Sequence, residues 1–225
     1  MPRLLDHRNA KPQERPIAAK TATGDTLVRG QSGLFSGTQV ATDQGWKVVE
    51  ALCVGDKVLT FDNGMQPIAR VHREVFWIEG ASQAHALRPV YLPAGAFGNR
   101  ADLWITPDQG LFVESDTTRD AMGDPFAVIP ARAVIGYRDA VAAMPRDLIE
   151  VTIISFAGEE VIYVDGGLLV HCAVQGDLLS GVTPKTASLY DVMDIAAACD
   201  LVESMQDDEP KARFFYDLDA AVCQS

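Results

Sequence analysis

Residues 33–64 read GLFSGTQVATDQGWKVVEALCVGDKVLTFDNG. Short apolar runs alternate here with turn-forming residues, as in Lys47–Val49 and Lys57–Phe61. The Asp-Asn-Gly triplet at Asp62–Gly64 suits the backbone angles that a tight hairpin turn requires. The stretch therefore predicts antiparallel β-hairpins.

The same spacing continues to about residue 175 and predicts an all-β fold, because many short strands separated by Gly, Asn and Pro turns are typical of that class. Further strands are expected at residues 68–72, 89–92, 103–106, 110–113, 148–154, 161–164 and 168–170. The stretch from Pro130 to Val134 carries apolar residues on one side only, which predicts one short helical piece.

A different pattern begins after Gly181. Thr183-Pro184 is a helix-start signal, and apolar residues then recur at helical spacing through about Met205. We expect an amphipathic helix that packs one apolar face on the β-domain or on a partner. That face consists of Leu189, Val192, Met193 and Ala196.

The landmarks of the opening stretch resemble those of the Hint (Hedgehog/intein) family. Leu34, Thr38 and Val40 fit the residues that follow the family's nucleophile, and Val54–Thr60 reproduces its Val-Gly-Asp turn and strand. Later stretches at residues 89–98 and 124–132 are similar to a strand, a turn and a loop of the family. The resemblance is closest to bacterial Hint-type modules, and it implies an antiparallel Hint-type β-domain.

The family's nucleophile position is held by Gly33. Members of the family place a Cys or Ser here, whose side chain attacks the preceding carbonyl to form a thioester or ester. Glycine has no side chain, so this first step is predicted to be lost.

The family's second block, Thr-x-x-His, reads Thr106-Pro107-Asp108-Gln109 in this chain. The resemblance implies that the His protonates the scissile nitrogen and that the Thr helps to hold the strained peptide. Gln109 forms hydrogen bonds but does not titrate near neutral pH, so acid catalysis is predicted to be missing.

The family's C-terminal block is similar to Tyr163–Cys172, which ends in His171 and Cys172. The Asn whose amide cyclises to cut the C-terminal junction is absent. We interpret Cys172 as a small buried apolar group and His171 as a hydrogen-bonded residue at a strand end. The alternative is a low-grade thiol and imidazole pair.

Ser32 and Ser36 flank the empty nucleophile position and are candidate substitutes. Successive side chains of a strand point to opposite faces, so Ser32 would face away from the site unless a bulge shifted the register. Ser36 would have to attack a different peptide bond. Both are weak candidates on these grounds.

Composition limits the remaining functions. The chain has 225 residues and a net charge of −12, with a basic leader and an acidic tail. An acidic body argues against nucleic-acid binding. The four cysteines lie far apart without a CxxC pair, so neither a disulfide framework nor a metal or other cofactor site is expected. A cytoplasmic location is expected, because no signal peptide and no membrane-length apolar run are seen.

The expected organisation is a flexible leader at residues 1–32, a Hint-like β-domain at 33–175, and a helix with an acidic tail at 176–225. Three functions stay open at this point. The favoured hypothesis is a non-enzymatic Hint-fold protein with a degenerate site, used for binding or scaffolding. The alternatives are a self-cleaving protein with a divergent nucleophile and an assembly protein that binds a protein partner through the C-terminal helix and tail.

Overall fold

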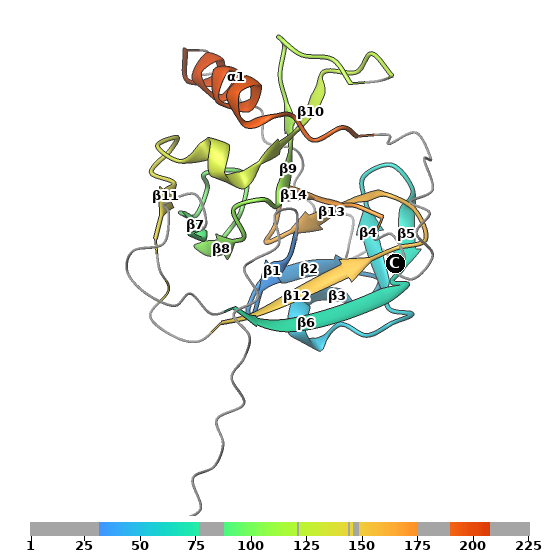
Figure 1. The fold of residues 1–225 in the computed structure, drawn as a ribbon. Coiled ribbons are helices and arrows are strands. Elements are labelled where there is room, and N and C mark those ends of the chain that lie inside the picture. The colour runs from blue at the N-terminus through green and yellow to red at the C-terminus, as the bar shows by residue number, and fades with distance from the viewer. Residues whose placement is uncertain are drawn as a thin grey trace, which may run out of the picture.

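A computed structural model describes residues 32–76, 88–120, 122–143, 145, 149–174 and 190–207 (Figure 1). The described strands form two sheets, and every pairing between named strands is antiparallel. The prediction of an all-β, antiparallel fold is confirmed, with one helix added at the C-terminal side of the described chain.

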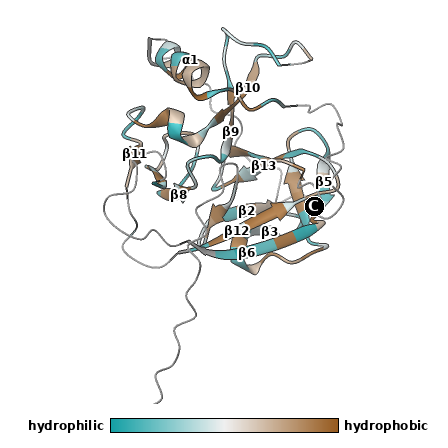
Figure 2. Ribbon diagram, viewed as in Figure 1, coloured by the Kyte–Doolittle hydropathy of each residue, from teal (hydrophilic) through white to brown (hydrophobic). Residues whose placement is uncertain are grey.

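The first sheet has six strands in the order β11-β7-β8-β1-β12-β6. Their bounds are β1 Leu34–Phe35, β6 Arg70–Phe76, β7 Val90–Leu92, β8 Leu103–Ile105, β11 Val141–Ala142 and β12 Ile149–Ser155. Figure 2 shows hydrophobic colours along β12 and mixed colours along the edge strand β6.

The second sheet has eight strands in the order β10-β9-β14-β13-β2-β4-β5, with β3 paired to β2. Their bounds are β2 Gln39–Thr42, β3 Gly45–Val48, β4 Lys57–Thr60, β5 Gly64–Pro67, β9 Gly110–Glu114, β10 Phe126–Pro130, β13 Glu160–Val164 and β14 Leu168–Cys172. All residues of β13 and β14 are buried, as expected of strands in the middle of a sheet.

One continuous core joins the two sheets. Its fully buried members come from both sheets and from both halves of the chain, and they include Val40, Val58, Val90, Leu92, Ile105, Leu111, Ile129 and Ile162. Two short 3₁₀ helices, η1 Val49–Ala51 and η3 Ala131–Val134, lie at corners of this core. The helical piece predicted from Pro130 to Val134 is confirmed by η3.

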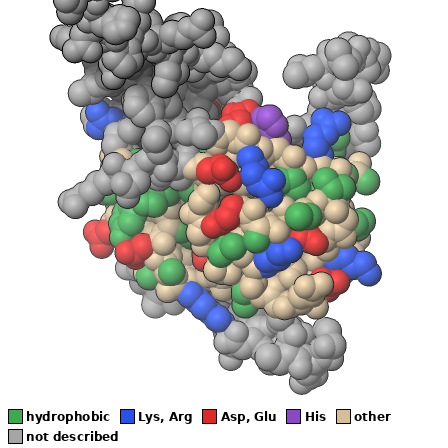
Figure 3. Space-filling view, turned by 90° about the horizontal axis from the view of Figure 1, so that it is seen from below, with side chains coloured by type: hydrophobic (Ala, Val, Ile, Leu, Met, Phe, Trp, Pro, Cys, Tyr) green, Lys and Arg blue, Asp and Glu red, His purple; other side chains and the backbone are tan. Residues whose placement is uncertain are grey.

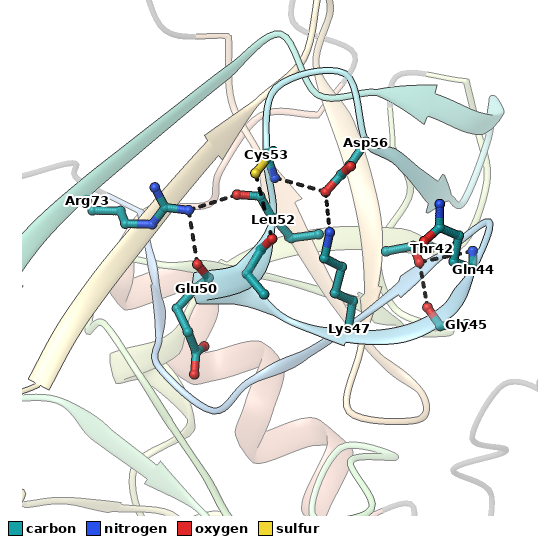
Figure 4. Close-up of polar contacts among 10 residues, drawn as sticks. Thr42, Gln44, Gly45, Lys47, Glu50, Leu52, Cys53, Asp56 and Arg73 are labelled. Atoms are coloured by element: carbon teal, nitrogen blue, oxygen red, sulfur yellow. Dashed lines mark hydrogen bonds and ion pairs between the residues drawn. The ribbon is translucent and has the colours of Figure 1, made fainter.

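Polar contacts hold the corner formed by β3, η1 and β4 (Figure 4). Lys47 forms an ion pair of 2.7 Å with Asp56, whose carboxylate also accepts the Cys53 backbone N–H. From β6, the Arg73 guanidinium donates to the backbone carbonyls of Glu50 and Leu52. These contacts connect the hairpin corner of one sheet to the edge strand of the other.

The C-terminal helix differs from its prediction. It spans Ile195–Asp207, whereas the sequence predicts a start near Thr183-Pro184, and residues 175–189 lie outside the described residues. Residues 190–194 are not helical, because Met193 donates its backbone N–H to Val128 on β10 instead. The side chain of Asp194 then caps the helix by accepting two backbone N–H groups of its first turn. The expected leader up to residue 31 and the acidic tail beyond residue 207 also lie outside the described residues.

The later start changes which face of α1 is buried. Ala198, Leu201 and Val202 are buried and Met205 is partly buried, which is the i, i+3, i+4, i+7 pattern of a helix face. This face packs on η3 and β10. The predicted helical face is wrong in part, because Val192 and Met193 lie before α1. Val192 is 47% exposed, Ala196 is exposed, Met193 is partly buried, and Leu189 lies outside the described residues.

Replacing Leu201 by Ala should destabilise the whole β-domain, since the side chain is only 6% exposed in the common core. We expect the free energy of unfolding to fall by about 2–4 kcal/mol, the usual range for a buried Leu→Ala change. The midpoint and slope of urea unfolding give this value. Ile195→Ala, on the exposed side of α1, is the control; equal losses in the two variants would mean that α1 does not share the core.

Candidate functional site

Thr106 holds both backbone polar groups of Gly33. Strands β1 and β8 pair at Leu34 and Ile105, which places Gly33 beside Thr106. The Gly33 N–H donates to Thr106 Oγ1 at 3.3 Å, and that hydroxyl donates to the Gly33 carbonyl at 3.2 Å. Thr106 is 1% exposed, so both hydrogen bonds are shielded from water. The family resemblance predicts that the first strand brings Gly33 near both Thr106 and the Leu169–Cys172 strand, and the approach to Thr106 is confirmed.

The space where a side chain of residue 33 would begin is filled. A Cβ atom built on Gly33 would lie 2.3 Å from Val151 Cγ1 and 3.2 Å from Ile153 Cγ1. Val151 and Ile153 are buried with Phe35 in a small cluster, against which Trp104 packs. A β-branched Val has few alternative rotamers, so this methyl group moves aside only with strain. Position 33 thus lacks a nucleophile and also lacks room for one.

Gln109 connects Thr106 to strand β14. Its backbone N–H donates to the Thr106 carbonyl at 3.1 Å, closing a turn. Its side-chain amide donates to the His171 carbonyl at 2.7 Å and to the Gly110 carbonyl at 3.2 Å. Both protons of the amide are therefore used on backbone carbonyls. Gln109 is 2% exposed and acts as a link between strands.

His171 is buried on β14 and paired with a carboxylate. Its Nε2 atom lies 2.5 Å from Glu159 Oε1, and its side chain is 4% exposed. Gly110 on β9 allows this position, because a Cβ there would lie 3.0 Å from His171 Cβ and 2.7 Å from a methyl group of Val128. The interpretation of His171 as a hydrogen-bonded residue of a strand agrees with these contacts.

Cys172 is buried beside an acidic residue. It pairs with Glu160 across β13 and β14, and it is 8% exposed. Burial, together with the charge of Glu160, raises the pKa of the Cys172 thiol to about 12. The thiol is therefore protonated at neutral pH, and a protonated thiol is a poor nucleophile. The arrangement disfavours a reactive Cys172.

The two candidate serines are placed differently. The Ser36 hydroxyl donates to the backbone carbonyl of Glu150 at 3.3 Å and is exposed. It therefore belongs to the pairing of β1 with β12. Ser32 is half-buried at the start of the described chain. Its neighbour Gly33 is the residue that Thr106 holds.

Sequence reasoning missed three residues that surround His171. Glu159 binds the imidazole, Tyr190 lies edge-on to the imidazole with ring centroids 6.2 Å apart, and Asp62 accepts the Tyr190 hydroxyl. Tyr190 and Asp62 are 128 residues apart in the chain. No local motif could have signalled that contact.

Asp165 is a buried carboxyl at the turn between β13 and β14. Its φ of +43° is the left-handed conformation that turns use. One carboxyl oxygen accepts the Gln39 N–H at 3.3 Å, while the other has no hydrogen-bond partner within the described part of the chain. Burial raises the pKa of Asp165 from 3.8 to about 6, although the Gln39 N–H partly offsets this.

Surface charge is mixed on the face that Figure 3 presents, where Lys and Arg side chains alternate with Asp and Glu. Within the described residues, no helix is long and apolar enough to cross a membrane.

Taken together, the site is a chain of contacts that runs from Gly33 through Thr106 and Gln109 to His171. In this antiparallel β-domain, the turn Thr106–Gln109 contacts both Gly33, just before the first strand β1, and His171 on the last strand β14. A family model described as "Hint domain" matches residues 32–171, which is more than half of the chain. The chain belongs to the Hint domain family.

Solved structures with similarity include a bacterial intein-like domain from Clostridium thermocellum, at 14% identity and a TM-score of 0.42, covering 63% of this chain and 99% of that one. The gp41-1 intein gives 15% identity and a TM-score of 0.38, covering 63% and 99%. The AceL NrdHF class 3 split intein gives 14% identity and a TM-score of 0.41, covering 64% and 100%. Comparison with curated proteins finds no match.

Introducing a nucleophile by Gly33→Cys should destabilise the fold, because its Cβ would overlap Val151 Cγ1. We expect a loss of about 1–3 kcal/mol, as for other overpacked positions. The double variant Gly33→Cys/Val151→Ala should lose less free energy of unfolding than the sum of the losses in the two single variants. Urea unfolding of the four proteins measures the difference; strict additivity would contradict the steric account.

Replacing Asp165 by Asn should change how stability depends on pH. Because folding raises the pKa of Asp165, the folded protein binds more protons than the unfolded chain at pH values between 3.8 and about 6. The free energy of unfolding therefore falls as the pH rises through that range. The introduced amide would not titrate, and Asn tolerates positive φ, so Asp165→Asn should gain stability over the parent as the pH rises.

Urea unfolding at a pH near 4 and at a pH above 6 tests this. Asp200→Asn, an exposed change on α1, controls for the loss of one negative charge. Parallel pH profiles for Asp165→Asn and the parent would show that the buried carboxyl does not control this part of the profile.

Proposed function

We propose that this chain is a Hint-fold module that does not process itself and acts by binding. The observation that carries the proposal is the methyl group of Val151, which lies 2.3 Å from where a side chain of residue 33 would begin. Here a neighbouring strand occupies the space, so the loss of the nucleophile is built into the packing.

The other family positions support the same conclusion. Gln109 uses its amide protons on two backbone carbonyls, His171 is paired with Glu159, and Cys172 is a buried thiol. Gln109 would have to give up its two hydrogen bonds, and Cys172 its burial, before either could take part in proton transfer or nucleophilic attack. These contacts favour a stable domain over a reactive one.

The protein should therefore remain intact after purification at neutral pH, with or without added thiol. Thiols accelerate Hint-type cleavage only by intercepting a thioester, and Gly33 cannot form one. Intact-mass spectrometry reports the result directly, and Ser32→Ala serves as the control. A cut mapped to the bond before Ser32 that disappears in Ser32→Ala, or any cut mapped to the bond before Gly33, would favour the self-cleaving alternative.

We further propose that the binding function uses the C-terminal helix and acidic tail to contact a protein partner. The inner face of α1 packs on the β-domain, whereas the outer side of the helix exposes Ile195, Asp200 and Glu203. The tail beyond Asp207 adds further acidic residues in sequence. This mixture of one apolar and several acidic groups suits a partner surface with basic residues around an apolar site.

The apparent mass of the native protein, measured in an extract of its source cell, tests this proposal. The full-length chain should migrate well above its own mass of 24.3 kDa, and a version ending at Asp207 should migrate closer to it. A full-length chain that migrates as a monomer would contradict the proposal.

A further inference from the structure

The residues that precede α1 lie along the edge of the eight-stranded sheet. Strand β10 ends that sheet, and Val192 forms a parallel bridge with Val128 on it. The Met193 N–H donates to the Val128 carbonyl at 2.8 Å. An extended segment that adds to a sheet edge through its backbone is a common mode of peptide recognition. The segment Tyr190–Asp194 is bound to β10 in this way.

Tyr190 is the anchor of this segment. It is 6% exposed and belongs to a buried cluster with Phe112, Val128 and Leu169. Its ring meets the Phe112 ring edge to face, with centroids 5.2 Å apart. The same ring lies edge-on to the imidazole of His171. A large aromatic side chain buried in this way supplies most of the contact that holds a short segment in place.

Carboxylates bind the two donors of Tyr190. Asp62 accepts its hydroxyl, and Glu159 Oε2 accepts its backbone N–H at 3.4 Å. The other oxygen of Glu159 is held by His171, so the imidazole positions the carboxylate. Burial first, and then Asp62, Asp120 and Glu159, raises the pKa of the Tyr190 phenol. These acidic groups favour a neutral phenol and would repel a phosphorylated tyrosine.

We propose that the β10 edge, Asp62, Phe112, Glu159 and His171 form a binding site for an extended, tyrosine-bearing peptide, and that this chain's own segment Tyr190–Asp207 occupies it. The apolar face of α1 on η3 and β10 is the second point of attachment. In this arrangement His171 is a positioning residue of a peptide site. The segment Tyr190–Asp207 is held on the β-domain by non-covalent contacts, so cutting the chain between β14 and Tyr190 would not release it.

The experiment uses the full chain with a protease site inserted between Gly181 and Val182. After folding and cutting, the two fragments should elute together, and dilution of the cut complex should measure the strength of their association. Tyr190→Phe should weaken this association about tenfold, because the Asp62 carboxylate loses the hydroxyl that it accepts. Asp62→Asn, made separately, should weaken it and should make Tyr190→Phe less harmful.

Tyr91→Phe is the matched control, since Tyr91 donates to Asp102 at 2.6 Å at an exposed place on the other sheet. It should leave the association unchanged. Fragments of the parent that separate on elution, equal affinities for Tyr190→Phe and Tyr91→Phe, or an exchanged dimer in place of a one-chain complex would each overturn the proposal. None of these results depends on whether the chain is cleaved before Gly33, so the proposed function is tested separately.

Discussion

The hydroxyl of Thr106 is the contact on which the arrangement of the domain depends. It binds both backbone groups of Gly33, and it sits at the start of the turn that Gln109 closes. Proline at position 107 favours an extended backbone at Thr106, which suits the end of β8. Through this turn the first strand of one sheet is tied to the last strand of the other. A buried hydroxyl with two backbone partners is costly to lose.

The same positions that carry chemistry in the family carry structure here. A reactive site needs a nucleophile with space around it and a group that can exchange a proton. In this chain, Val151 closes the space at Gly33, and the amide of Gln109 is bound to two carbonyls. His171 binds Glu159, and through it contacts Tyr190. Contacts at these positions therefore link the strands of the domain to one another and, through Glu159, to the segment that begins at Tyr190.

Much of the fold could be predicted from sequence, because turn residues and apolar runs are local signals. The strands around Lys57 and Val161 and the approach of Gly33 to Thr106 follow from such signals and from the family pattern. The predicted start of α1 is wrong, since backbone pairing of Met193 with Val128 outweighs helical periodicity. The Val151 contact and the Tyr190 site depend on residues that meet only after folding, and no periodicity indicates them.

Hydrogen exchange at the Gly33 backbone amide, followed by NMR, tests the central claim most directly. If the Thr106 hydroxyl holds Gly33 in place, the free energy of opening at this amide should be nearly as large as the free energy of global unfolding. Thr106→Val, which keeps the shape and removes the hydroxyl, should abolish that protection while β13 and β14 amides remain protected. Rapid exchange at Gly33 in the parent protein, or unchanged protection in Thr106→Val, would contradict the account.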